Sequence, residues 1–310
     1  MKVVFFGTPW AALPALGSLV DAGHELVLVI TQPDRPAGRG KEPTPSPVKT
    51  AALARKISVL QPEKIRTDPR ILEALKAAAP DINVVVAYGQ IIPRVIIDLP
   101  RFKSVNVHFS LLPKYRGAAP VQWAILNGEE KTGVTIFELN ERMDEGDILS
   151  RVEVDIRPRE KAYELEGRLS RIGADLLVKS LDGIASLPRL PQDHAQATTA
   201  PRLRKDQGRI DWTKESIAVD RLVRAFSPWP GAHTFYRGRR LVVREGIPLS
   251  VPEPTPRPGR IVEIRKEGPL IGCGGGGAYL AVRLQQENKR EMAAADFLLG
   301  TKMEAGEDLG

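Results

Sequence analysis

An amide, an imidazole and a carboxylate stand close together in the middle of this chain. Asn106 and His108 are two residues apart, and Asp144 follows in an acidic turn. The amide can donate a hydrogen bond to a developing oxyanion, the imidazole can move a proton or donate as a cation, and the carboxylate can orient it. Since no cysteine lies near and no serine is obviously paired with His108, these residues favour direct transfer of a carbonyl group to an amine over a covalent intermediate.

Each of these residues alone also has a structural interpretation. A single histidine at a strand end is often a hydrogen-bonded structural residue, and an acidic turn is usually a solvated surface. The grouping of Asn106, His108 and Asp144, beside a loop rich in proline and glycine, favours catalysis over that alternative.

The elements that must position this trio alternate between strands and helices. Apolar runs at residues 3–6, 26–30 and 82–87 predict strands that are buried on both faces. The alternation predicts an α/β domain with a doubly wound, mostly parallel, Rossmann-like sheet, in which ligands bind beyond the C-terminal ends of the strands. Asn106 and His108 fall at such an end, in the predicted strand 104–108. Helices are predicted to start where a capping residue precedes proline, at Thr8-Pro9, Ser46-Pro47 and Asp68-Pro69.

The second half of the chain has a different pattern. A long amphipathic helix is predicted over about 162–184, followed by an aperiodic, basic stretch. Short β-type runs separated by Gly/Pro-rich turns then predict a small β-barrel of the OB type. The predicted organisation is a catalytic domain at 1–187, a basic linker at 188–208 and an OB-like barrel at 209–310.

Charge points to a polyanionic partner. Residues 201–290 hold 18 lysine and arginine residues against 9 aspartate and glutamate residues, whereas residues 291–310 hold 1 against 5. Nucleic acid is the leading partner for the basic segment, and a solvated basic surface is the alternative. The acidic tail 301–310 is expected to fray.

Other features limit the cellular context and the cofactors. The single cysteine, Cys273, fits a reducing compartment, and the chain shows neither a secretory leader nor an apolar run long enough to span a bilayer. We therefore expect a cytoplasmic protein with no membrane association. Four unclustered histidines and no cysteine pair argue against a metal site. The turn Phe6-Gly7-Thr8-Pro9 lacks the glycine fingerprint of a dinucleotide site, which disfavours a nicotinamide enzyme.

The segment 31–50 is longer than a simple connection between a strand and a helix. It carries five prolines and four basic residues, so it could contact a phosphate backbone. The equally supported alternative is a mobile surface loop.

Taken together, these motifs resemble the methionyl-tRNA formyltransferase family over nearly the whole chain. The Asn-x-His-x-Ser-Leu-Leu-Pro segment with the downstream Asp144 is typical of folate-dependent formyltransferases, and the proline-rich basic loop narrows the resemblance to the tRNA enzymes. Trp10-Ala11 and Phe109 depart from the family pattern, which leaves the shape of the substrate pocket open. The matching pieces are 6–9, 32–41, 46–49, 84–89, 106–120, 132–136, 144–147, 210–212 and 226–230.

The resemblance implies formyl transfer from 10-formyltetrahydrofolate, as the donor co-substrate, to the α-amino group of initiator methionyl-tRNA, which produces N-formylmethionyl-tRNA for translation initiation. It implies that Asn106, His108 and Asp144 are the catalytic residues, and we expect a monomer. The implied folate-binding residues are Val86, Ala87, Tyr88, Gly89, Ser110, Leu111, Leu112 and Pro113, and the implied tRNA-binding residues are Arg35, Arg39, Lys41, Arg202, Arg204 and Lys205.

Three rivals stay open from the residues themselves. A formyltransferase acting on a small amine would share the site but would not need the basic segment. A non-catalytic RNA-binding protein on an α/β scaffold would keep the basic segment but would not use folate. A nicotinamide reductase is the third and is weakened by the missing fingerprint.

Overall fold

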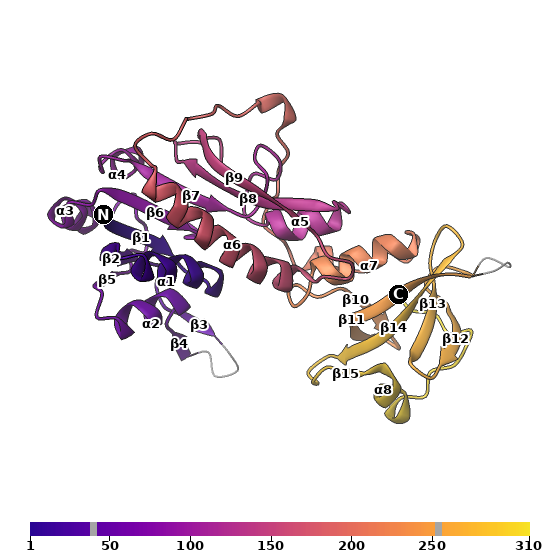
Figure 1. The fold of residues 1–310 in the computed structure, drawn as a ribbon. Helices are drawn as coiled ribbons and strands as arrows, with labels where there is room; N and C mark the ends of the chain where they lie inside the picture. The colour runs from indigo at the N-terminus through magenta and orange to yellow at the C-terminus, as the bar shows by residue number, and fades with distance from the viewer. Residues whose placement is uncertain (38–41, 252–255) are drawn as a thin grey trace. The chain divides into compact units, whose positions relative to one another are not determined.

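A computed structural model describes residues 1–37, 42–251 and 256–310 and contains two compact units (Figure 1). The first unit comprises Met1–Pro120, Lys131–Asp155 and Glu166–Pro201, and the second comprises Val121–Glu130, Ile156–Leu165 and Arg202–Gly310. The units therefore interleave along the chain. The domain bounds 1–187, 188–208 and 209–310 stay a prediction. Within the described ranges, no helix is long and apolar enough to cross a membrane.

A seven-stranded sheet forms the centre of the first unit. The strand order is β5-β2-β1-β6-β7-β8-β9, with parallel pairing from β5 to β7 and antiparallel pairing of β8 and β9 at one edge. The predicted mostly parallel sheet is confirmed, while β9 was not predicted. The strands of this sheet are β1 (Lys2–Gly7), β2 (Glu25–Ile30), β5 (Val59–Leu60), β6 (Ile82–Val86), β7 (Ser104–His108), β8 (Lys131–Glu138) and β9 (Ile148–Asp155), and a separate hairpin consists of β3 (Arg35–Ala37) and β4 (Glu42–Thr44).

The helix starts follow the capping signals at two of the three predicted places. The Ser46 hydroxyl accepts a hydrogen bond from the backbone N–H of Lys49, and the Asp68 carboxylate accepts one from the N–H of Arg70. At the third place a helical segment begins at Trp10, but the predicted cap at Thr8 was wrong: Pro9 is the N-cap, and the Thr8 hydroxyl donates to the carbonyl of Tyr88 instead. The helical elements that follow are η1 (Trp10–Ala12), α1 (Leu13–Asp21), α2 (Pro47–Ala54), α3 (Pro69–Ala78), α4 (Arg94–Ile97), α5 (Pro120–Leu126), α6 (Ala162–Asp182) and η2 (His194–Gln196).

Different helices cover the two faces of the sheet. On one face, side chains of α3 and α4 pack with Phe6 of β1 and Val85 of β6. On the other face, α6 lies so close to β7 and β8 that a Cβ on Gly173 would meet Val107 at 2.9 Å and Val134 at 3.2 Å (Figure 1). The strands are therefore buried on both sides, as their continuous apolar runs predict.

The second unit is built on an antiparallel sheet with the order β10-β11-β14-β13-β12, to which β15 is added beside β14. Its core includes Trp212, whose indole N–H donates to the hydroxyl of Thr234 at 3.1 Å. The predicted combination of an α/β domain with a small β domain is confirmed. From residue 202 onward its elements are η3 (Asp206–Gly208), α7 (Ser216–Ala225), β10 (His233–Tyr236), β11 (Arg239–Ser250), β12 (Ile261–Arg265), β13 (Gly268–Gly272), β14 (Gly277–Gln286), β15 (Met292–Ala293) and α8 (Ala294–Gly300).

The C-terminal tail is held in place, so the prediction that it frays was wrong. Met303 and Leu309 are buried in the core of the second unit, and the N–H of Gly310 donates to the carbonyl of Phe235 at 3.0 Å. The Glu307 carboxylate accepts hydrogen bonds from the Tyr236 hydroxyl at 2.8 Å and from the Arg237 guanidinium at 2.7 Å. Charge counting could not reveal these partners, because they lie about 70 residues earlier in the chain.

We predict that Glu307→Gln lowers the melting temperature by a few degrees near neutral pH and has little effect near pH 2. The Arg237 guanidinium and further hydrogen bonds hold the pKa of Glu307 at about 2, below its ordinary value of 4.5. The folded state thus binds fewer protons, so the stabilisation is complete above about pH 4.5 and is lost as the pH falls toward 2. Thermal unfolding followed by circular dichroism between pH 2 and 7 measures this, with Glu304→Gln as the control in the same tail. Equal pH profiles for wild type and Glu307→Gln would contradict it.

Candidate active site

Three strand ends are tied together at the C-terminal edge of the sheet. The carbonyl of Tyr88, just after β6, accepts hydrogen bonds from the Thr8 hydroxyl after β1 at 3.0 Å and from the Gln32 side chain after β2 at 3.1 Å. The chain can bend away from β6 there because Ala87 and Gly89 adopt positive φ angles of 48° and 88°. This edge is where ligands bind in open α/β sheets.

Asn106 and His108 lie on the same face of β7, since they are two residues apart in one strand. In β8 they face Phe137 and Thr135 respectively. The Asn106 side chain is half-buried and makes no hydrogen bond to any residue that the structure describes. It can therefore donate to a ligand without losing an internal partner.

His108 is 5% exposed, and its two ring nitrogens have different partners. Nε2–H donates to the carbonyl oxygen of Tyr115 at 2.9 Å. Because a carbonyl can only accept, this bond sets the tautomer and leaves Nδ1 as the nitrogen that can exchange a proton. Nδ1 lies 3.8 Å from Oδ2 of Asp144. That separation is an ion pair once His108 is protonated, but it is longer than a hydrogen bond.

Two glycines allow Asp144 to reach this position. The N–H of Gly117 donates to Oδ2 of Asp144 at 2.7 Å, and a Cβ at Gly117 would lie 2.6 Å from the carbonyl oxygen of Ala200. A Cβ at Gly146 would overlap the carbonyl oxygen of Glu138. Asp144 itself adopts a positive φ of 55°, which is uncommon for a residue other than glycine and marks a constrained turn.

The turn that carries Asp144 has neighbours which the sequence patterns did not reveal. Gln192 and Arg116 are both buried, and the Gln192 side chain donates to the carbonyls of Asp144 at 2.9 Å and Gly146 at 2.7 Å. Gln192 lies within the stretch predicted to be a linker, where no periodicity or motif marks it. Arg116 lies within the matched segment 106–120, but its residue type alone does not distinguish it from a surface arginine.

The predicted folate-binding residues fall into two groups. Val86 is the last residue of β6, Ala87 to Gly89 follow it, and Ser110 to Pro113 follow β7, the neighbour of β6 in the sheet. The Tyr88 side chain packs on Phe6 in the core, and burial raises its pKa well above the ordinary value, so only its backbone can face a ligand. Val86 is buried, whereas Ala87 and Gly89 are exposed.

Hydrogen bonds to Thr135 of β8 hold the segment after His108 against the sheet. The Ser110 hydroxyl donates to the carbonyl of Lys114 at 2.6 Å, and the Thr135 hydroxyl donates to the Ser110 carbonyl at 2.7 Å. The N–H of Leu112 donates to the Thr135 hydroxyl at 3.2 Å. Ser110 and Leu112 are buried, whereas Leu111 and Pro113 are partly exposed, so these two can contact a ligand directly.

The two departures from the family pattern both lie against α6. Phe109 points to the face covered by α6, where its ring lies 3.6 Å from the position of a Cβ on Gly173. Trp10 is 43% exposed and its ring lies against Gly167 of the same helix. His108 and Asn106 face the opposite side of the sheet from Phe109.

The predicted tRNA-binding residues are exposed where the structure describes them. Arg202 and Lys205 are exposed, and Arg204 pairs with Asp206 at 3.1 Å. Arg35 is exposed on β3 and pairs with Glu63 at 3.1 Å. Arg39 and Lys41 lie outside the described residues.

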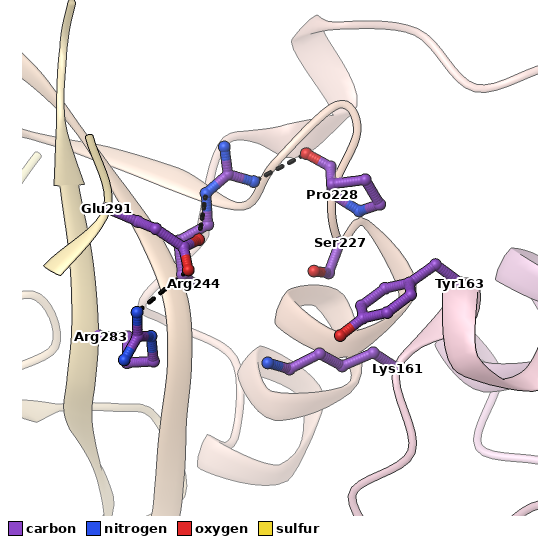
Figure 2. A pocket seen from close by; sticks show the side chains of 7 residues that line it. All are labelled: Lys161, Tyr163, Ser227, Pro228, Arg244, Arg283 and Glu291. Atoms are coloured by element: carbon purple, nitrogen blue, oxygen red, sulfur yellow. Dashed lines mark hydrogen bonds and ion pairs between the residues drawn. The ribbon is translucent and has the colours of Figure 1, made fainter. Parts of the chain in front are cut away.

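A cavity of about 250 Å³ lies within the second unit, lined by Lys161, Arg244 and Arg283 among others (Figure 2). Lys161 pairs with Glu245 at 3.1 Å, and Arg283 pairs with Glu291 at 3.1 Å. Burial lowers the pKa of Arg244. Each of these three cationic side chains has a carboxylate within 4.0 Å. Across the described residues, no group of three or more histidine, cysteine, aspartate or glutamate side chains is placed to hold a metal ion.

Comparison with known proteins gives a match to two sequence families that together span most of the chain. Residues 1–181 match the formyl transferase family, and residues 202–302 match the formyl transferase C-terminal domain family. A methionyl-tRNA formyltransferase from Solibacter usitatus is 46% identical over 312 residues, with 100% of this chain and 99% of that protein covered.

Solved structures share the fold at much lower identity. An N-formyltransferase from Helicobacter canadensis, in complex with folinic acid and dTDP-3-aminofucose, is 19% identical with a TM-score of 0.66, covering 92% of this chain and 99% of that chain. HypX from Aquifex aeolicus, in complex with tetrahydrofolic acid, is 18% identical with a TM-score of 0.63. That match covers 96% of this chain and 47% of HypX, so this chain spans about half the length of HypX.

Proposed function

This chain belongs to the methionyl-tRNA formyltransferase family, and on that premise we infer that it transfers a formyl group from a formyl folate to methionyl-tRNA. We propose 10-formyltetrahydrofolate as the donor and the α-amino group of initiator methionyl-tRNA as the acceptor. The product, N-formylmethionyl-tRNA, would serve translation initiation. The proposal includes action in the cytoplasm as a monomer, without a metal.

The observation that supports this chemistry best is the grouping of Asn106, His108 and Asp144 at the C-terminal edge of the sheet. The Asn106 amide, which makes no hydrogen bond to a described residue, can serve as the oxyanion donor that amine acylation needs, and Nδ1 of His108 can serve as the proton acceptor. When bound, 10-formyltetrahydrofolate supplies the formyl carbon that the amine attacks. Leu111, Pro113 and the backbone of Ala87 to Gly89 would hold it.

Asn106 acts on the oxygen of the formyl group. Its side-chain N–H donates to that oxygen as negative charge develops there, and it is available to do so because no described residue accepts from it. The donor stands on a central strand, between β6 and β8, and so moves little during the reaction. Such preorganised donors are most effective where charge develops in the transition state.

His108 and Asp144 handle the proton. Nδ1 of His108 takes a proton from the attacking amine, while Nε2–H remains bonded to the Tyr115 carbonyl. As the tetrahedral intermediate collapses, the bond between the formyl carbon and the folate nitrogen breaks, and the proton on Nδ1 passes to that leaving nitrogen. The Asp144 carboxylate, 3.8 Å from Nδ1, stabilises the imidazolium that forms. Asp144 stays in place because its Oδ2 also accepts the hydrogen bond from Gly117.

The basic residues would bind the tRNA part of the acceptor. Arg202, Lys205 and the partly paired Arg204 are exposed in the second unit and would contact phosphates of the tRNA. Arg35, together with Arg39 and Lys41, is proposed to contact the acceptor stem from the segment after β2.

A direct assay tests the proposal. Purified protein is given 10-formyltetrahydrofolate with methionyl-initiator tRNA, uncharged tRNA or free methionine, and formylated product is measured. We expect product only with methionyl-tRNA, because the basic residues bind the tRNA and only the charged tRNA carries the amine. Equal use of free methionine or of an amino sugar would support the small-amine rival, and RNA binding without any transfer would support the non-catalytic one.

We predict that Asn106→Ala lowers kcat about 10²- to 10³-fold, the usual cost of one oxyanion donor. Asp144→Asn should also lower kcat severely, because a neutral amide cannot stabilise the imidazolium. The dissociation constants for tRNA and for the folate should stay within a few-fold of wild type. Asn140→Ala, which changes an exposed amide in the same unit, is the control. Parallel losses of affinity and turnover would contradict the catalytic assignment.

We predict that tRNA affinity falls steeply with salt and that Arg202→Gln reduces the slope of log K against log salt concentration by about 1. The removed phosphate contact releases fewer counterions, which is why the slope changes. Filter binding at several salt concentrations measures it. Arg94→Gln, which changes an exposed arginine that pairs with Asp98 on α4, is the matched control and should leave the slope unchanged. An unchanged slope for Arg202→Gln would rule out its phosphate contact.

A further inference from the structure

The segment that follows α6 reaches back to the turn that carries Asp144. Gln192 is 6% exposed, and its side-chain amide donates to two backbone carbonyls of that turn, at 2.9 Å to Asp144 and 2.7 Å to Gly146. The carbonyl of Leu190, two residues earlier, accepts a hydrogen bond from the N–H of Ile148, just after the turn. Both N–H groups of the Gln192 amide therefore donate to carbonyls of the same turn, residues 144–146.

A second set of bonds determines which way the Gln192 amide points. Its Oε1 accepts from Nε of Arg116 at 3.1 Å and from Nη2 of Arg116 at 2.7 Å. A guanidinium can only donate, so Oε1 must face Arg116 and Nε2 must face the turn. Arg116 is itself oriented by Glu145 of the same turn, whose Oε1 lies 3.5 Å from Nη1.

The same segment also holds the other side of His108. The N–H of Arg116 donates to the carbonyl of Thr198 at 2.9 Å, and the N–H of Tyr115 donates to the Thr198 hydroxyl at 2.9 Å. The carbonyl of Tyr115 is the acceptor for Nε2 of His108. Residues 192–198 thus form hydrogen bonds with both segments that contact the His108 ring. These are the turn that carries Asp144 and the loop that carries Tyr115.

We propose that Gln192 is a positioning residue for formyl transfer, acting through Asp144. The proposal rests on the proposed function. Its two hydrogen bonds hold Asp144 at a φ of 55°, so that the carboxylate stays 3.8 Å from Nδ1 of His108 and on the N–H of Gly117. Gln192 touches no reacting atom. It sets the place of the group that stabilises the imidazolium, in the manner of outer hydrogen bonds that orient the groups of an active site.

The experiment compares Gln192→Leu and Gln192→Glu with wild type. Leucine keeps the approximate volume and removes both donors, and glutamate keeps the shape but cannot donate to the two carbonyls. We expect kcat to fall about 10- to 100-fold in both, as for misplacement of a catalytic group by about 1 Å. KM for methionyl-tRNA and the dissociation constant of the folate should change less than about threefold. Gln196→Leu is the matched control, because Gln196 is in the same segment but, among the described residues, its side chain bonds only to the exposed Asp193.

A double-mutant cycle separates positioning from a general structural role. If Gln192 acts through Asp144, adding Gln192→Leu to Asp144→Asn should produce no further loss in single-turnover rate, because coupled residues are not additive. Full additivity would overturn the proposal. So would a loss of activity that only follows the unfolded fraction measured by circular dichroism at the assay temperature.

The remaining outcomes are also decisive. Wild-type rates in both Gln192 variants, alongside a strong effect of Asp144→Asn, would overturn this inference and leave the proposed function intact. Absence of transfer by the wild-type protein would overturn the proposed function, and the role of Gln192 with it.

Discussion

The candidate site depends on holding one carboxylate beside a buried imidazole. Asp144 is placed by the N–H of Gly117 at 2.7 Å, and this bond is possible only because Gly117 has no Cβ to collide with Ala200. His108 is 5% exposed, and its Nδ1 lies 3.8 Å from Oδ2 of Asp144, so the carboxylate is placed to form an ion pair when the imidazole is protonated. A turn held at a positive φ is costly, and the surrounding hydrogen bonds offset that cost.

The site is assembled from distant parts of the chain. Four segments come together around the imidazole of His108. They are the strand that carries Asn106 and His108, the loop 110–117, the turn 144–147 and the segment after α6. The loop supplies backbone groups, the carbonyl of Tyr115 and the N–H of Gly117, whereas the other three segments supply side chains.

The two compact units alternate along the chain, so segments that are neighbours in the sequence can belong to different units. Val121–Glu130 and Ile156–Leu165 belong to the unit that also holds the basic residues Arg202 and Lys205. The second unit therefore draws on residues from within the formyl transferase match at 1–181 as well as on the C-terminal match at 202–302. Substitutions in these short segments are expected to affect the stability of the second unit.

Sequence alone determined the parts that depend on local periodicity and residue type. Continuous apolar runs predicted β1, β2 and β6, capping residues predicted the starts of α2 and α3, and the pairing of Asn106 with His108 placed the candidate site at a strand end. Tertiary structure alone decided the rest. Thr8 and Glu307 find their partners about 80 and 70 residues away, so the predicted helix cap at Thr8 and the predicted frayed tail were wrong. Gln192 was missed for the same reason, because a hydrogen bond to a turn 48 residues earlier leaves no period, cap or motif in the sequence.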